Sequence, residues 1–465
     1  MTQLQDKTGS GTGRPGGRAL AQLGLRMSDW FERWFPDAFA LALIAVVVVF
    51  AASVAAGAPP LEAARWFGAG FWDLMAFTLQ VAMIIVTGYA VAIAPPVFRI
   101  ISRLADIPKH PRTAMAFVAL FSMLSSLLSW SFSLIFSALL AREVGRRLER
   151  ADYRALGAAA YVGAGSVWAL GLSSSAALIM AAPGSLPDSI KAISGVIPLQ
   201  QTIGLWQSMA AAVILIVVSM AIAYYSTPDA QDARSITAMG VTPAEHAPVP
   251  LPTRPGEWVE HSPVLTLLVG GFGLWFLLRE VATSGWQVLL DLNHYILAFF
   301  VAGMLLHWRP RSFMNAVSAS VGSTGGVLVQ YPMYAGMVKM MTASGLATAM
   351  AHFFVQVSTH STLPVLVGMY SAVLGFFIPS AGGKWLIEAP YVLQAAKSLD
   401  VHLGWMVQTY NASEALANLV HPFWMLPLLG ILGLRARDIV GYSMLQFVVH
   451  VPLVLLLVWM FNLTL

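Results

Sequence analysis

Long apolar runs dominate this chain and limit what it can fold into. Runs of about 20 apolar residues, the length of a membrane-spanning helix, occur near 36–57, 71–94, 157–182, 204–226, 262–279, 288–307, 320–342, 404–432 and 438–463. Because 58% of the 465 residues are hydrophobic and only 10% are charged, a water-soluble core cannot bury this much apolar surface. The sequence therefore predicts an all-α polytopic membrane protein.

Three landmarks recur in the same order about 250 residues apart, which indicates an internal duplication. The paired segments are 77–80 with 327–330, 129–133 with 375–380, and Tyr161 followed by Trp168 with Tyr410 followed by Asn418. Chance similarity in so apolar a chain is the alternative. When the crossings are counted, the first copy begins inside at residue 36 and the second begins outside at residue 286. The sequence thus predicts inverted repeats, an architecture typical of secondary transporters.

The first copy contains a segment that we expect to enter the membrane and return. Residues 113–140 are flanked on both sides by lysines and arginines, so the positive-inside rule places both ends in the cytoplasm. The serine-rich stretch 125–133 supplies hydroxyls that can satisfy backbone groups freed at a helix break. We predict a re-entrant hairpin near 113–148, with one ordinary helix whose serines face its neighbours as the alternative.

The second copy contains a matching segment at 363–399. Pro379, Gly382 and Gly383 interrupt it, and such residues do not sustain a helix interior. We predict a second re-entrant hairpin there. The predicted organisation is a disordered cytoplasmic tail (1–26), a first repeat (27–226), a cytoplasmic linker (227–261), a connecting helix (262–285) and an inverted second repeat (286–465).

Two hairpin tips that meet within the membrane form a candidate anion site. Helix N-termini and unpaired amides bind a carboxylate without a formal charge. The predicted substrate-binding residues are Ser129, Trp130, Ser131, Ser133, Ser380, Gly382, Gly383 and Lys384, with Gln80 and Gln330 at matched repeat positions. Backbone repair at two kinks is the alternative for the tips, and hydrogen bonding to a neighbouring helix is the alternative for the glutamines.

Charged residues at membrane depth are costly and need partners. Lys384 and Glu388 are four residues apart, so they can form a salt bridge, or Lys384 can face the substrate. The predicted ion-binding residues are Glu414, Asn418 and His421, whose ligand atoms suit a sodium ion or a proton relay. Solvation at a helix end is the alternative for Glu414, and packing is the alternative for His421. No metal site or other cofactor is predicted.

Several motifs together resemble the short-chain fatty acid transporters. They are the segments 34–37, 70–74, 84–88, 141–144, 330–336 and 379–385. The 379–385 run, and the series Glu414, Asn418 and Pro422, are also similar to p-aminobenzoyl-glutamate and C4-dicarboxylate carriers of the ion transporter superfamily. The resemblance implies uptake of short carboxylates such as butyrate or acetoacetate by a dimeric elevator-type secondary transporter with two hairpins.

The chain departs from the family pattern at the presumed site. Ser129-Trp130-Ser131-Phe132-Ser133 stands where the family pattern has Asn-Trp-Gly-Phe-Gly, and Lys384 stands where a histidine can occur. Both differences leave the substrate and the coupling ion open.

We expect a secondary active carrier rather than an enzyme. A multi-pass location in the bacterial inner membrane with a cytoplasmic N-terminus is predicted, with a homodimer as the assembly and no nucleic-acid partner. Trp130, Phe377 and Trp385 would form apolar walls around a short acyl chain. The alternatives are an intramembrane enzyme that acts on a lipid-linked acid with Glu414 or His421 as its base, and a passive anion channel.

Overall fold

The computed structural model describes residues 33, 38–184, 186–229, 231–241, 253–376 and 381–465, and these residues form helices joined by short connections. No strand occurs within those ranges, so the predicted all-α fold is confirmed. The α-helices are α2 (Ala38–Ala55), α3 (Pro60–Gly70), α4 (Met75–Ala92), α5 (Pro95–Ala105), α6 (Pro111–Leu128), α7 (Trp130–Arg147), α8 (Tyr153–Ser166), α9 (Ser175–Ala181), α10 (Asp188–Ser194), α11 (Trp206–Tyr225), α12 (Pro255–His261), α13 (Pro263–Ser284), α14 (Leu292–His307), α15 (Pro310–Val321), α16 (Gly325–Ala343), α17 (Leu346–Val357), α18 (Leu363–Gly375), α19 (Ala381–Ser398), α20 (Leu403–Asn418), α21 (Pro422–Leu432) and α22 (Ala436–Asn462). The 3-10 helices are η1 (Trp168–Leu170), η2 (Leu199–Gln201), η3 (Trp286–Leu290) and η4 (Gly322–Thr324).

Several of these helices are long and apolar enough to cross a membrane. Six such segments are Met75–Ala92, Pro111–Leu128, Tyr153–Ala181, Trp206–Tyr225, Pro255–Ser284 and Ala436–Asn462, as judged by length and composition. Helix α13 exposes Leu268, Phe272 and Trp275 on its surface, which suits contact with lipid.

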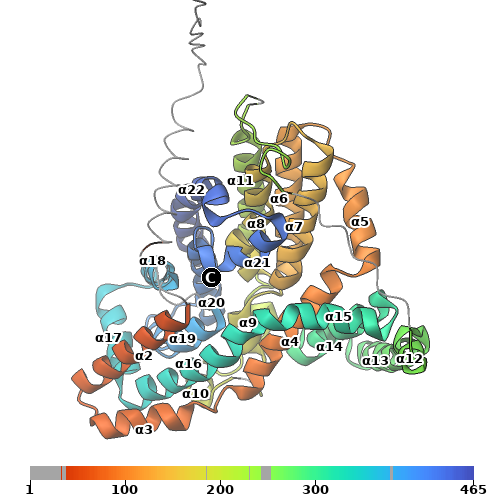
Figure 1. Cartoon of the computed structure of the whole chain (residues 1–465). Helices are drawn as coiled ribbons and strands as arrows, with labels where there is room; N and C mark the ends of the chain where they lie inside the picture. Colours follow the sequence, from red (N-terminus) through yellow and green to blue (C-terminus); the bar gives the residue numbers. More distant parts are fainter. Residues whose placement is uncertain (1–32, 34–37, 185, 230, 242–252, 377–380) are drawn as a thin grey trace, which may run out of the picture.

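The order of elements occurs twice along the chain. The series α2 to α9 and α11 is followed by a series of matching helices, α14 to α22, in which α6–α7 correspond to α18–α19 and α8–α9 correspond to α20–α21. The packing repeats as well, because α2 and α3 lie against α16 while α14 and α15 lie against α4. Each half therefore packs its first helices on the other half. Figure 1 shows α2, α3 and α16 together at the lower left and α14 and α15 beside α4.

Both predicted hairpins are pairs of consecutive helices. In the first, α6 and α7 are separated by Ser129 alone, and they pack on each other and on α8. In the second, α18 ends at Gly375 and α19 begins at Ala381. Phe377 and Ser380, which belong to the predicted second tip, lie outside the described residues.

Two runs that we expected to be single spans are each broken. The run near 157–182 divides into α8, η1 and α9, and the run near 404–432 divides into α20 and α21. Close packing explains the first break, because a Cβ at Gly171 would lie 2.3 Å from the carbonyl oxygen of Leu127. Pro422 explains the second, since proline lacks an N–H and starts the new helix α21. Neither run is one continuous helix, although Tyr153–Ala181 is still apolar and long enough to count as one candidate membrane span.

The described part of the predicted linker, residues 227–229, 231–241 and 253–261, is only partly irregular. The backbone N–H of Tyr153 donates to the carbonyl of Arg234 over 2.8 Å, so this stretch is attached to the start of α8. Its last residues form α12, which precedes α13 directly. The predicted tail, residues 1–26, lies outside the described residues.

Candidate functional site: a cavity between two hairpin tips

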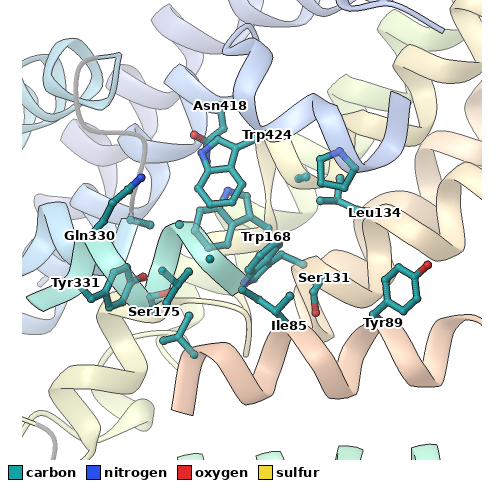
Figure 2. Close-up of a pocket in the computed structure, with 18 of the residues that line it drawn as sticks. Ile85, Tyr89, Ser131, Leu134, Trp168, Ser175, Gln330, Tyr331, Asn418 and Trp424 are labelled. Carbon is teal, nitrogen blue, oxygen red and sulfur yellow. The ribbon is translucent and has the colours of Figure 1, made fainter. Parts of the chain in front are cut away.

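A cavity of about 810 Å³ lies where the hairpin tips and the broken helices converge. Figure 2 shows Gln330 and Tyr331 on one side of it and Ser131, Ile85 and Tyr89 on the other, with Trp168 and Trp424 between them. The cavity is lined by Phe39, Val81, Ile85, Tyr89, Trp130, Ser131, Leu134, Ile135, Ala164, Trp168, Ser175, Gly322, Gly325, Gly326, Val327, Val329, Gln330, Tyr331, Ala381, Asn418, Trp424 and Pro427. None of these described lining residues is charged.

The first tip is held by hydrogen bonds of its serines. Ser129 is the N-cap of α7, where its hydroxyl accepts from the backbone N–H of Phe132 at 3.4 Å. The hydroxyl of Ser131 donates to the carbonyl of Ile84 in α4 over 3.1 Å. Gly88 permits this approach, because a Cβ there would lie only 2.1 Å from the Ser131 Oγ. The tip is therefore fitted tightly against α4.

Ser133 acts within the hairpin rather than at the cavity surface. Its hydroxyl donates to the carbonyl of Ser122 over 2.8 Å, and the Ser125 hydroxyl donates to it over 3.1 Å. Neither Ser129 nor Ser133 lines the large cavity, whereas Trp130 and Ser131 do. Of the four residues predicted at the first tip, two thus face the cavity and two support them.

The second tip reaches the same cavity through the start of α19. Ala381 lines the cavity, and a Cβ added at Gly382 would lie 3.0 Å from the hydroxyl of Tyr331. Gly382 and Gly383 are buried and do not line the cavity. Since α7 and α19 both begin at this cavity, two helix N-termini face it from the two repeats.

The cavity walls are largely aromatic and aliphatic. Trp130 packs edge-on against Trp424 with ring centroids 5.4 Å apart. The predicted wall residue Trp385 instead lies behind the cavity, where it is fully buried and packs against Tyr410 at 4.8 Å. Polar side chains at the cavity come from Tyr89, Ser131, Ser175, Gln330, Tyr331 and Asn418.

The two glutamines at matched repeat positions have different surroundings. Gln330 lines the cavity, and its Oε1 accepts from the Tyr334 hydroxyl at 3.1 Å. Gln80 does not line it; its Nε2 donates to Oδ1 of Asn293 in α14 over 2.7 Å. Only Gln330 is therefore placed to contact a molecule in the cavity.

The three charged residues predicted at membrane depth form one buried group behind the second tip. Lys384 Nζ lies 2.6 Å from Glu414 Oε2 and 3.5 Å from Glu388 Oε1, and all three side chains are 0% exposed. The 2.6 Å contact is an ion pair whose angles fall outside those of an aligned hydrogen bond. Lys384 is not among the cavity-lining residues, and Glu414 is enclosed rather than solvated.

Asn418 and His421 lie at the break between α20 and α21. Asn418 lines the cavity, and its backbone carbonyl accepts from the Tyr161 hydroxyl at 2.5 Å. Its Oδ1 has no hydrogen-bond partner within the described ranges. His421 is hydrogen-bonded to the backbone of Phe376 at the end of α18. The described residues hold no group of three or more histidines and carboxylates arranged to bind a metal.

Some site residues were not predicted. Trp168, Ser175 and Trp424 line the cavity, and Ser371 and Tyr410 surround Lys384. Ser174 and Ser175 carried a usable signal, because consecutive serines inside an apolar run are typical of a helix start, and Ser174 caps α9. Trp168 occupies the repeat position that corresponds to Asn418, so the duplication pointed to it.

Comparison with known proteins identifies the family. The profile described as "Short chain fatty acid transporter" matches residues 19–461. The chain belongs to the short-chain fatty acid transporter family. It is 36% identical over 419 residues to a candidate short-chain fatty acid transporter of Escherichia coli (strain K12), covering 90% of this chain and 94% of that protein. A relative of the same description from Haemophilus influenzae is 32% identical over 434 residues, covering 92% and 96%.

Two solved transporter structures share the fold at low sequence identity. The YdaH transporter of Alcanivorax borkumensis superposes with a TM-score of 0.59 at 15% identity, covering 92% of this chain and 98% of that one. MtrF of Neisseria gonorrhoeae, described within a class of antimetabolite efflux pumps, gives a TM-score of 0.56 at 14% identity, covering 93% and 97%. These likenesses support a polytopic membrane transporter fold for the family member described here.

Proposed function

We propose that this chain is a secondary active carrier that moves short-chain fatty acids or similar small carboxylates, such as butyrate and acetoacetate, across the membrane. The observation that carries the proposal is the cavity shared by both tips, lined by Trp130 and Ser131 from α7 and by Ala381 from α19. A site made from both repeats can open to either side as the repeats move against each other.

The chemistry of the cavity suits a small monocarboxylate. Helix N-termini and hydroxyls stabilise a carboxylate through dipoles and hydrogen bonds, so no lysine or arginine is needed in the lining. The apolar walls, including Trp130, Trp168 and Trp424, suit an acyl chain. Gln330 and Ser131 supply polar contacts that orient the head group.

A coupled cation, either sodium or a proton, completes the proposed mechanism. Glu414 and Asn418 provide oxygen atoms beside the second tip, and the unpartnered Oδ1 of Asn418 supports this position. His421 lies at the adjacent break. Binding of cation and substrate together would offset the substrate charge before the hairpins move in an elevator-like step, in a homodimer of the bacterial inner membrane with a cytoplasmic N-terminus.

Uptake into proteoliposomes tests the proposal. Labelled butyrate and acetoacetate are supplied with an imposed sodium gradient, a proton gradient or neither. Concentration of either substrate against its gradient supports a coupled carrier. Simple equilibration contradicts coupling and favours a passive channel, and recovery of a changed product favours an intramembrane enzyme.

A further inference from the structure

Lys384 is enclosed like a bound cation. Its amino group donates to the carbonyl oxygen of Ser371 over 2.5 Å and lies near Glu414 Oε2 and Glu388 Oε1 at 2.6 and 3.5 Å. It also lies 4.7 Å from the centre of the Tyr410 ring. A main-chain carbonyl and two carboxylates are oxygen ligands of the kind that hard cations take. The ammonium therefore occupies a place that would otherwise suit a metal cation.

The helices around this group bring their close-packing surfaces to it. Ser371 belongs to α18, Lys384 and Glu388 to α19, and Glu414 to α20. A Cβ at Gly375 would lie 3.1 Å from Glu414 Oε2 and 3.5 Å from Lys384 Nζ, so α18 closes over the pair.

The group is nevertheless short of positive charge. One ammonium faces two carboxylates, and all three side chains are 0% exposed, so full ionisation would leave a buried net negative charge. Within the described ranges no other lysine or arginine pairs with either carboxylate. One bound proton removes the imbalance.

The neighbouring titratable groups do not supply positive charge. The groups that face the carboxylates are the tyrosines Tyr334 of α16, Tyr370 of α18, Tyr391 of α19 and Tyr410 of α20. The basic groups on the helices packed against α18, α19 and α20 are exposed or have other partners. Lys191 of α10, His352 of α17 and Arg437 of α22 are exposed. Lys339 of α16 lies 3.8 Å from Asp73, Lys397 of α19 donates to the carbonyl of Ile193, Arg154 of α8 pairs with Asp152, and His450 of α22 is hydrogen-bonded to Ser219 and Gln446. His421 is engaged with the backbone of Phe376.

The distances indicate which carboxyl holds the proton. Glu414 is the closer partner of the ammonium, so it keeps its negative charge. Glu388 is more distant, and its Oε2 accepts a hydrogen bond from the Ser371 hydroxyl. Glu388 is therefore the carboxyl that can gain and lose a proton.

The group also connects to the cavity. The Tyr410 ring lies under the Lys384 ammonium, and the Tyr410 hydroxyl donates to the carbonyl of Ala381 over 2.5 Å. Ala381 lines the cavity. One side chain, Tyr410, thus contacts both the ionic group and the wall of the cavity.

We propose that the Lys384 ammonium is a tethered cation that replaces sodium beside the second tip, and that the coupling ion is a proton carried by Glu388. This inference rests on the proposed carrier function. One proton from outside binds the Glu388 carboxylate, travels with one monocarboxylate and is released inside, so each cycle is electrically neutral.

The test compares driving ions in the full-length protein. Wild-type protein should accumulate labelled butyrate with a proton gradient and show no response to a sodium gradient. Glu388→Gln should still exchange external labelled butyrate for butyrate loaded inside the vesicles. Its proton-driven accumulation of butyrate should be about tenfold lower than that of wild type, since the amide cannot carry the proton. Lys397→Met, on the exposed end of the same helix, is the matched control for lysine removal and should behave as wild type.

Removal of the tethered cation should create a sodium requirement. Lys384→Met should bind sodium, which raises its Tm by about 2 °C or more as sodium is added, while the Tm of wild type and of Lys397→Met stays unchanged. In the double variant K384M/E388Q, Glu414 is the one carboxylate of the group that remains. If K384M folds poorly, the effect of sodium on Tm is measured on this double variant instead.

The outcomes separate the two proposals. Two results would overturn the tethered-cation inference while the carrier function stands. One is sodium-driven uptake by wild type, and the other is a Tm of both K384M and K384M/E388Q that does not change when sodium is added. Absence of butyrate and acetoacetate exchange in wild type under every gradient would overturn the carrier function, and the inference with it.

Discussion

The two hairpins share a backbone plan but differ in chemistry. Ser133 and Lys384 are both the fourth residue of their helices, α7 and α19. In the first hairpin the serine hydroxyl bonds the carbonyl of Ser122, and no charge is buried at this level. In the second the lysine holds Glu388 and Glu414 in a fully buried ionic group. The two copies thus share one scaffold, and of these two matched positions only the second carries a buried charge.

This asymmetry is consistent with different roles for the two tips. The first tip offers neutral hydroxyls and Trp130 to the cavity, which suits the substrate itself. The second tip offers backbone at Ala381 and keeps its charges behind the wall, at Lys384. Charge in the second hairpin can therefore change the energy of moving the site without blocking the substrate.

The largest expected effect comes from removing a charge from the buried ionic group behind the second tip. Glu414→Gln removes the closest partner of Lys384, so the ammonium should pair with Glu388 and hold it ionised. We expect gradient-driven butyrate uptake to fall by about tenfold or more, with a smaller loss of folded protein. Uptake into proteoliposomes and detergent-solubilised yield measure the two effects. Glu62→Gln, an exposed partner of Arg65, is the control; wild-type coupling in Glu414→Gln would remove Glu414 from the mechanism.

The next effect comes from disturbing the uncharged first tip. A Cβ at Gly88 would lie 2.1 Å from the Ser131 Oγ, so Gly88→Ala should displace the first tip from α4. Misplacement of a binding group by about 1 Å costs on the order of 100-fold in rate, and we expect uptake to fall by at least about tenfold on that scale. Gly68→Ala, whose Cβ would meet no atom within 4 Å, should leave the rate of uptake unchanged. Equal rates in the two variants would show that the fit of the first tip is not needed.

The matched glutamines sharpen the comparison between repeats. Gln330 lines the cavity, whereas Gln80 bonds Asn293 away from it. Gln330→Ala should raise the KM for butyrate by about fivefold, because one hydrogen bond is worth roughly 1 kcal/mol. Gln80→Ala should leave KM unchanged and affect only stability. A larger KM change in Gln80→Ala would reverse the assignment of the two residues.

The sequence predicted the helical fold, the duplication and both hairpins because these depend on patterns within single segments. Apolar length, positive charge at both ends of 113–140, and the residues Pro379, Gly382 and Gly383 are visible without a partner. The break within 404–432 follows from Pro422, which is visible in the sequence. The break within 157–182 was missed, because it follows from contact of Gly171 with Leu127 of another helix. Such a contact between two helices cannot be predicted from the apolar pattern of either helix.

The candidate site was predictable in part for the same reason. Lys384 and Glu388 were recognised as a possible pair from their spacing, and Glu414 was singled out by its charge. That all three side chains form one group could not be predicted from the sequence, because it depends on how α18, α19 and α20 pack together. Spacing likewise could not separate Gln330 from Gln80, since the difference between them lies in which helix each one faces.

The smallest expected effect tests whether the two tips differ in kind. Ser133→Ala removes the hydroxyl that donates to the Ser122 carbonyl over 2.8 Å. A single hydrogen bond contributes about 1 kcal/mol to stability, so thermal unfolding should show a modest decrease in Tm. The gradient that drives uptake should not change, because Ser133 carries no charge and does not line the cavity. If Ser133→Ala instead altered the ion dependence of uptake, the first hairpin would share the ionic role that we assign to the second, and the two copies would act as equivalent halves.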